Sequence, residues 1–108
     1  MAAILGALEQ AVLLAIVRLD DDAYGRAVLR ETSKRLGREV SAGAAYATLD
    51  RLEERALLAS RLNDGNRERG GRARRYYTIT ANGVRALNES RTAIQGIWAG
   101  VRWPVRLA

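Results

Sequence analysis

The densest group of reactive side chains is a cluster of arginines in the second half of the chain. Of the 18 basic residues 17 are arginine, and the segment Arg61–Tyr76 holds 6 basic and 2 acidic residues, a net charge of +4. Gly65, Gly70 and Gly71 within it favour a loop. Guanidinium groups bind anions such as phosphates, so an anionic partner is expected, the alternative being a solvated loop that keeps the domain soluble. The candidate ligands are Arg67, Arg69, Arg72, Arg74 and Arg75.

Catalytic chemistry is poorly represented. The sequence contains neither Cys nor His, which excludes disulfides, thiolate or imidazole metal sites, Cys nucleophiles and triads with a His base. The carboxylates of Asp20, Asp21 and Asp22 stand on a turn where helix capping explains them. The sequence has no phosphate-binding Gly-Lys-Ser/Thr motif and no dinucleotide fingerprint. We therefore expect a protein that is not an enzyme and that needs no metal or cofactor.

Length and hydropathy predict a single small domain. The chain has 108 residues, of which 48% are hydrophobic and 28% charged, as in ordinary globular proteins. The longest apolar run, Ala11–Val17, is far shorter than the roughly 20 residues of a membrane span, and no signal peptide is recognisable. A cytoplasmic protein without a membrane partner is expected. Because domains of this size bury a limited fraction of their surface, a dimer would fit.

Apolar periodicity predicts three helices in the first half of the chain. The first covers residues 4–18, with an inward stripe at Leu5, Leu8, Val12, Ala15 and Leu19 that Leu14 and Ile16 widen. The acids at 20–22 end it and are expected to cap a second helix, residues 23–36, which Gly37 closes. Ser41 is the expected cap of a third helix, whose buried face is Ala45, Leu49, Leu52 and Ala56.

A hairpin and a last helix follow. Leu58, Ser60 and Leu62 alternate with their neighbours, as do Tyr77 and Ile79, which predicts two strands joined by the arginine-rich loop. Thr80 is the expected cap of the last helix, which Pro104 ends. Its apolar residues follow heptad spacing, with Arg91 filling one gap: Val84, Leu87, Ile94, Trp98 and Val101.

This order of elements predicts a mainly α fold with a small β-hairpin, a winged helix-turn-helix extended by one C-terminal dimerisation helix. Residues 1–80 are expected to form the winged-helix DNA-binding domain and residues 81–103 the dimerisation helix, within one structural unit. The small residues after Ser41 allow the third helix to approach a DNA groove closely. Its free N–H groups can meet a phosphate while the wing lies along the adjacent backbone or minor groove.

Four segments carry a resemblance to a known family: Tyr24-Gly25, Ser41–Glu53, Arg69–Tyr77 and Thr80–Gly83. With them nearly the whole chain resembles the PadR family of bacterial transcriptional regulators, in its short form with a single C-terminal helix. The resemblance implies that the third helix enters the major groove and that Tyr46 and the wing hold the DNA backbone. It also implies a dimer formed by the last helix, usually together with the first.

The resemblance and the residue pattern together give two sets of candidate sites. The candidate DNA contacts, besides the five loop arginines, are Tyr24, Ser41, Gly43, Ala44, Tyr46 and Arg51. The candidate dimer contacts are Leu5, Leu8, Val84, Leu87, Arg91, Ile94, Trp98 and Val101. Alternative roles are core packing for Tyr24, half-buried packing beneath the wing for Tyr46 and helix capping for Ser41.

Trp98 has a second candidate role. Some short members of the family bind flat aromatic compounds between the C-terminal helices through tryptophan, so the resemblance implies a small aromatic effector here. The alternative is an ordinary residue of the dimer seam.

The chain departs from the family at Ala56, where Gly is common, and at Ala42 and Ala47, where Pro is frequent. A left-handed helix end at Ala56 would cost about 1 kcal/mol.

The function expected from these observations is sequence-specific DNA binding by a homodimeric regulator. We expect a repressor that acts sterically at a palindromic operator whose half-sites lie about one helical turn apart. The main alternative is a winged-helix module that binds another protein without specific DNA binding. RNA binding through Arg69-Gly70-Gly71-Arg72 is a weaker alternative, because only Tyr76 and Tyr77 could offer stacking rings on a sheet.

Overall fold

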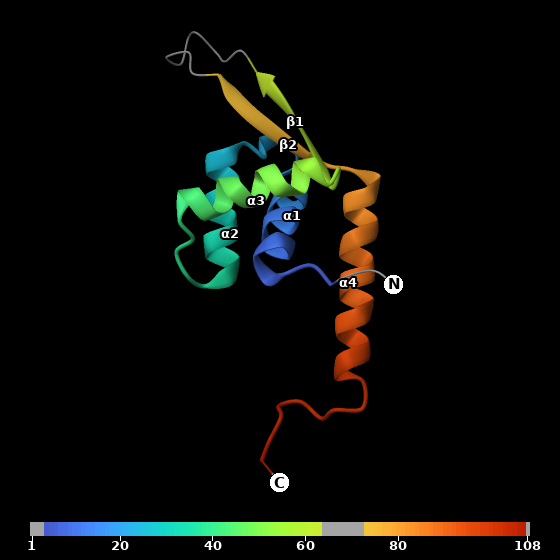
Figure 1. Ribbon diagram of the computed structural model, residues 1–108. Coiled ribbons are helices and arrows are strands. Elements are labelled where there is room, and N and C mark those ends of the chain that lie inside the picture. Colours follow the sequence, from blue (N-terminus) through green and yellow to red (C-terminus); the bar gives the residue numbers. More distant parts are fainter. Residues whose placement is uncertain (1–3, 64–72, 108) are drawn as a thin grey trace.

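The computed structural model describes residues 4–63 and 73–107 (Figure 1). These residues form helices and strands in the predicted order: α1 (Ala7–Leu19), a 3₁₀ turn η1 (Asp20–Asp22), α2 (Gly25–Leu36), α3 (Ala42–Glu54), β1 (Leu58–Asn63), β2 (Arg74–Ile79) and α4 (Ala81–Trp98). The two strands pair in antiparallel register from Leu58–Ile79 to Asn63–Arg74. The mainly α arrangement with one hairpin is the one that the sequence predicts.

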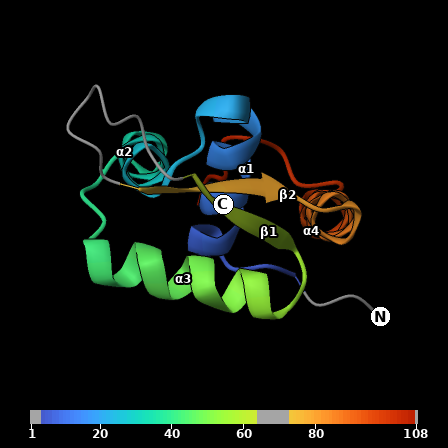
Figure 2. The same cartoon turned by 90° about the horizontal axis from the view of Figure 1, so that it is seen from above.

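Helix α1 forms the centre of the fold. It packs against α2, α3, β2 and α4, and Figure 2 shows it between the other three helices. Each aliphatic side chain that is buried in this core contributes about 1.5–3 kcal/mol to the stability of the fold. The core cluster draws on every element of the winged-helix unit: Leu5, Val12, Leu13, Ala15, Ile16, Ala23, Val28, Leu49, Leu52, Leu57, Leu58 and Tyr77.

The predicted helix caps at Ser41 and Thr80 are confirmed. Ser41 Oγ accepts a hydrogen bond from the N–H of Ala44 at 3.1 Å, and Thr80 Oγ1 accepts one from the N–H of Gly83 at 3.0 Å. Each bond satisfies one of the amides that the start of a helix leaves free. Gly37 ends α2 in the left-handed conformation, with φ of 67°, as expected.

The starts of α1 and α2 differ from the prediction. Helix α1 begins at Ala7 rather than at residue 4, because Gly6 is the N-cap and Leu5 is held outside the helix by a bond from its N–H to Ser90 Oγ at 3.0 Å. Helix α2 begins at Gly25 rather than at residue 23. The expected caps are also wrong, since the three acids form η1 and the N-cap, Tyr24, makes no side-chain capping bond.

The end of α3 also differs from the prediction. Ala56 does not belong to the buried stripe: it is exposed and has a left-handed φ of 60°. The N–H of Leu57 donates to the carbonyl of Leu52 and that of Ala56 to the carbonyl of Glu53, both at 2.9 Å. This is a Schellman ending, which normally uses glycine at the position of Ala56. The helix therefore ends with a left-handed, strained alanine at the position where the resembled family commonly has glycine.

The end of α4 also differs from the prediction. The helix stops at Trp98, and Ala99 then turns extended while Gly100 takes a φ of 79°. Pro104 therefore lies beyond the helix end, and Val101 is not on the helix at all. The glycines at 96 and 100 weaken helix formation by about 1 kcal/mol each, and α4 has no core beneath it there. A smaller difference concerns β1: the side chain of Leu62 is 56% exposed rather than turned inward.

Candidate nucleic-acid interface

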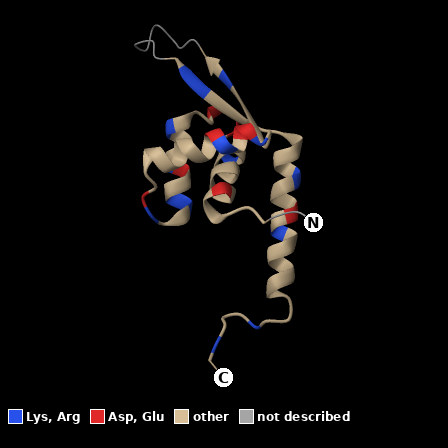
Figure 3. Cartoon of the chain, in the orientation of Figure 1, with Lys and Arg blue, Asp and Glu red and all other residues tan. Residues whose placement is uncertain are grey.

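A basic groove lies where the starts of α2 and α3 meet the outer part of β2. Its volume is about 710 Å³. Four arginines and no acidic residue are among the described residues that line it: Tyr24, Gly25, Arg26, Leu29, Arg30, Ala42, Tyr46, Ala73, Arg74, Arg75 and Tyr77. Figure 3 shows the basic residues on β1 and β2 beside it. Concentrated positive charge without carboxylates is the electrostatic environment that a phosphate backbone needs.

The start of α3 borders this groove with small side chains. Ala42, Gly43 and Ala44 are exposed, and Ser41 is exposed while it caps the helix. With no large side chain in the first turn, the backbone can approach another molecule closely. Arg51 lies further along α3, is exposed and donates to Thr48 Oγ1 at 3.2 Å. It does not line the groove.

Tyr46 lies against the first turn of α2. A Cβ added at Gly25 would lie 2.7 Å from Cε1 of Tyr46, a distance that real Cβ atoms do not tolerate. Gly25 thus allows the close approach of this ring, which gives the Tyr24-Gly25 motif a packing reason. The ring is still 41% exposed and lines the groove. The packing role of Tyr46 is therefore against α2, and the part of its ring that stays exposed faces the groove; contact with DNA stays a prediction.

Tyr24 joins α2 to the wing. It forms an isolated antiparallel bridge with Tyr76, and the N–H of Tyr77 donates to the carbonyl of Ala23 at 2.9 Å. The rings of Tyr24 and Tyr76 meet edge to face, with centroids 5.9 Å apart. The residues before α2 thus act as a short third strand, which fixes how β2 lies against α2.

The arginines of the hairpin have different surroundings. Arg74 lies over the Tyr24 ring at 4.2 Å, and Arg61 lies over the Tyr76 ring at 5.1 Å. Arg75, the next residue, donates instead to Ser60 Oγ at 3.0 Å, and Ser60 donates to Glu53 at 2.7 Å. Arg74 and Arg75 thus have different partners, although both line the groove. The candidates Arg67, Arg69 and Arg72 lie outside the described residues.

Sequence reasoning missed two arginines of the groove, Arg26 and Arg30. They stand four residues apart on α2 and therefore share one face of the helix. That spacing was visible in the sequence, but nothing in the sequence placed this face of α2 beside β2.

Within the described residues, none of the helices has the length and hydropathy of a membrane span, and no cluster of acidic, His or Cys side chains could hold a metal ion.

Comparison with known proteins gives this surface a context. The model of the PadR-like family of transcriptional regulators matches residues 13–89, which include α2, α3 and both strands. The chain belongs to this family. The PadR resemblance is thereby confirmed, as is the prediction that the chain is a DNA-binding transcriptional regulator and not an enzyme.

Individual relatives agree. The chain is 41% identical over 76 residues to the transcriptional regulator Rv3488 of Mycobacterium tuberculosis, a match that covers 70% of this chain and 66%, slightly under two thirds, of that protein. A PadR family regulator from Eggerthella lenta has a TM-score of 0.67 and 29% identity, covering 88% of this chain and 80% of that one. A PadR-like regulator from Bacillus cereus has a TM-score of 0.65 and 26% identity, covering 88% of this chain and 94% of that one. These structures confirm the winged-helix fold.

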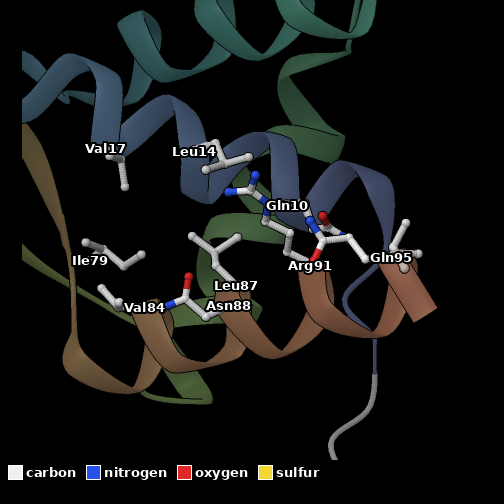
Figure 4. Close-up of a pocket in the computed structure, with 10 residues that line it drawn as sticks. Gln10, Leu14, Val17, Ile79, Val84, Leu87, Asn88, Arg91 and Gln95 are labelled. Atoms are coloured by element: carbon white, nitrogen blue, oxygen red, sulfur yellow. The ribbon is translucent and has the colours of Figure 1, made fainter. Parts of the chain in front are cut away.

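The PadR-like chain has a second exposed surface, between α1 and α4. A groove of about 590 Å³ is lined there by Gln10, Leu14, Val17, Ile79, Val84, Leu87, Asn88, Arg91, Ile94 and Gln95. Figure 4 shows Leu14 and Val17 of α1 across from Val84 and Leu87 of α4. The groove is apolar apart from its amides and the guanidinium of Arg91, and it shares no lining residue with the basic groove.

The candidate dimer residues of this PadR-like chain fall into three groups. Val84, Ile94 and Trp98 are exposed on α4, and Val101 is exposed beyond its end. Leu8 and Leu87 are partly buried against the core, and Leu5 is 4% exposed and belongs to the core itself. Trp98 does not line the apolar groove; its ring meets that of Trp103 edge to face at 5.6 Å. Exposed apolar residues that the prediction missed are Ile4, Leu14, Val17 and Ile97.

Proposed function

We propose that this PadR-like chain is a sequence-specific repressor that binds a palindromic operator as a homodimer in the cytoplasm. Helix α3 enters the major groove, and the wing and the start of α2 follow the neighbouring backbone. The observation that carries this proposal is the groove lined by four arginines and no described acid, between the starts of α2 and α3 and β2. The contacts on α3 are proposed to be Ser41, Gly43, Ala44, Tyr46 and Arg51, and those of the wing Arg67, Arg69, Arg72, Arg74 and Arg75.

The proposed dimer joins α1 and α4 of two copies. The shape of one copy supports it: the radius of gyration is 16.2 Å and the extents are 61 × 28 × 21 Å. A compact domain of this length has a radius of about 13 Å. The excess comes from the second half of α4 and the following residues, which project from the domain in Figure 1. A helix whose second half exposes Ile94, Ile97 and Trp98 is best stabilised there by a second copy.

Repression then follows from geometry. A two-fold axis between the α4 helices would present two α3 helices to successive major grooves, so the half-sites should lie about one helical turn apart. Occupied DNA would block transcription sterically. A small flat aromatic effector that meets Trp98 could change the angle between the wings. This part is tested by tryptophan fluorescence and DNA affinity across a panel of aromatic compounds; no change in either measurement would rule it out.

The experiment that tests the proposed function is fluorescence anisotropy with the duplex upstream of the protein's own coding region, against a scrambled duplex, over a series of salt concentrations. With about 8 phosphate contacts per dimer, log K should fall against log salt with a slope of roughly −7. Binding that prefers the native duplex supports a specific regulator. Equal binding to both duplexes would contradict specificity at this site, and no binding at low salt would favour a protein-binding winged helix.

A further inference from the structure

Two arginines from different elements converge on one aromatic ring in the basic groove. The guanidinium of Arg74, on β2, lies over the Tyr24 ring, 4.2 Å from its centroid. The guanidinium of Arg30, on α2, donates from Nη2 to the hydroxyl oxygen of the same ring at 3.1 Å. A cation above an aromatic face and a donor at a phenol oxygen are both attractive contacts. Each therefore limits the positions that its arginine samples.

Among the residues that the structure describes, no carboxylate pairs with either of the two positive charges. Residues 4–63 and 73–107 contain two ion pairs, Glu31–Arg35 and Glu9–Arg55, and neither includes Arg30 or Arg74. Both arginines line the basic groove, which has no carboxylate among its described lining residues. Holding two like charges on one ring is unfavourable unless an anion lies between or beside them. Phosphate suits the site because guanidinium groups bind its oxygens with paired hydrogen bonds.

The ring itself is fixed. Tyr24 bridges to Tyr76, meets its ring edge to face and precedes α2 as N-cap. Its hydroxyl already accepts a bond from Arg30 and its face is covered by Arg74. It therefore acts through the two arginines, and it keeps α2 and the wing at a set separation. Side chains that are ordered before binding avoid an entropic cost when the complex forms.

We propose that Arg30 and Arg74 form a two-arginine clamp that binds one stretch of the DNA phosphate backbone, and that Tyr24 is the positioning residue of this clamp. The proposal rests on the proposed binding of duplex DNA and adds to it a ligand from α2, Arg30. It assigns Tyr24 a role different from direct contact with DNA.

The clamp is tested by anisotropy with the full chain and the preferred duplex, over the same salt series. Arg30→Ala and Arg74→Ala should each weaken binding about tenfold. Each should also make the salt slope less steep by about 2 per dimer, because one phosphate contact is lost in each copy. Arg85→Ala is the matched control: Arg85 is exposed on α4, donates a hydrogen bond to Asn82 of the same helix, and is not among the described residues that line the groove. It should leave both quantities unchanged.

The positioning role predicts a different pattern for Tyr24. Tyr24→Phe keeps the ring under Arg74 and removes the bond to Arg30, so affinity should fall two- to threefold; Tyr24→Leu removes both contacts and should cost more, about tenfold. The salt slope should stay at the wild-type value in both, since the arginines still release counterions. Circular dichroism at the assay temperature identifies variants that are folded, and Tyr24→Phe serves if Tyr24→Leu is not.

Each result decides one part of the proposal. If Arg30→Ala and Arg74→Ala bind like Arg85→Ala, the clamp is wrong although the regulator still binds DNA. If the folded Tyr24 variants keep wild-type affinity, or lose as much salt slope as the arginine variants, the positioning role is wrong. If the wild-type protein binds no duplex, the proposed function fails first, before any variant is compared.

Discussion

The backbone N–H of Leu5 donates a hydrogen bond to Oγ of Ser90, which joins the residues before α1 to the middle of α4 at 3.0 Å. Ser90 is fully buried, and Leu5 is 4% exposed. The bond satisfies an amide that would otherwise be buried without a partner, and it sets how α4 lies against α1.

Ser90→Ala tests the strength of this tie. The change leaves the N–H of Leu5 buried and unpaired, so we expect the free energy of unfolding to fall by about 1–3 kcal/mol, measured by urea denaturation. Thr92→Ala, at an exposed position of the same helix, is the control and should change stability by less than about 0.5 kcal/mol. Equal effects of the two substitutions would show that the buried bond contributes nothing.

Ala56→Gly should make the protein more stable. Ala56 holds a left-handed φ of 60° in the Schellman ending of α3, a conformation that glycine adopts without strain. We expect a gain of about 1 kcal/mol and a rise in Tm of about 4–8 °C. Ala47→Gly makes the same chemical change inside α3 and should instead cost about 1 kcal/mol. A loss of stability in Ala56→Gly would contradict the ending described here.

The buried phenol of Tyr77 should make the folded protein less stable at alkaline pH. Burial raises the pKa of its phenol above the ordinary value of 10.0, and the nearby guanidinium of Arg75 opposes part of that rise. As pH rises above 10, the unfolded chain loses this proton first, so the folded state loses stability between the unfolded and the folded pKa, by up to about 1.4 kcal/mol per pH unit.

Tyr77→Phe keeps the ring and removes the proton. The difference in unfolding free energy between wild type and variant should be constant from about pH 6 to pH 9 and should then shift in favour of the variant above about pH 10. Urea denaturation at each pH measures it. Parallel pH profiles through pH 11 would show that burial does not shift this group.

The α1–α4 surface is tested by Val84→Asp together with Ile94→Asp. These side chains are 46% and 38% exposed, so charges there should spare the core while they disrupt an apolar contact between copies. We expect the dimer to dissociate at micromolar concentration in sedimentation velocity and operator binding to weaken at least tenfold. Leu87 is a poorer choice, because it packs against the core of its own chain.

Asn82→Asp with Thr92→Asp is the matched control for the dimer. It adds the same two charges to exposed positions of α4 outside the apolar groove, so the dimer should persist. A wild-type protein that sediments as a monomer, or a Val84/Ile94 variant that remains dimeric, would contradict the proposed interface.

Local patterns predicted the helices well because their causes are local. The stripe of Ala45, Leu49 and Leu52 and the caps Ser41 and Thr80 depend on residues three or four positions apart, and all are confirmed. The exact ends were less predictable. The acids of η1 could cap a helix or close a turn, and only the tie between Ala23 and Tyr77 decides that α2 starts later.

The candidate site depended on contacts that local patterns do not contain. Arg26 and Arg30 join the groove because α2 lies beside β2, and Leu5 leaves the dimer candidates because Ser90, 85 residues later, holds it in the core. Close approach is similarly non-local: a Cβ at Gly83 would overlap the carbonyl oxygen of Leu57, which explains the glycine in the Thr80–Gly83 motif. The sequence predicted candidate residues for both surfaces, and the packing of distant elements determines which of them line the two grooves.

In the proposed dimer, the projecting half of α4 would link the concentration of the protein to the extent of repression. Pairing of two copies through this helix would bury Ile94 and Ile97 and would also bring together the two α3 helices that the proposed palindrome requires. Operator occupancy then rises with about the square of the monomer concentration at low expression, because two chains must meet before both half-sites are contacted. A small change in the rate of synthesis would therefore give a larger relative change in repression. The steepness of that response would depend on the dimerisation of α4.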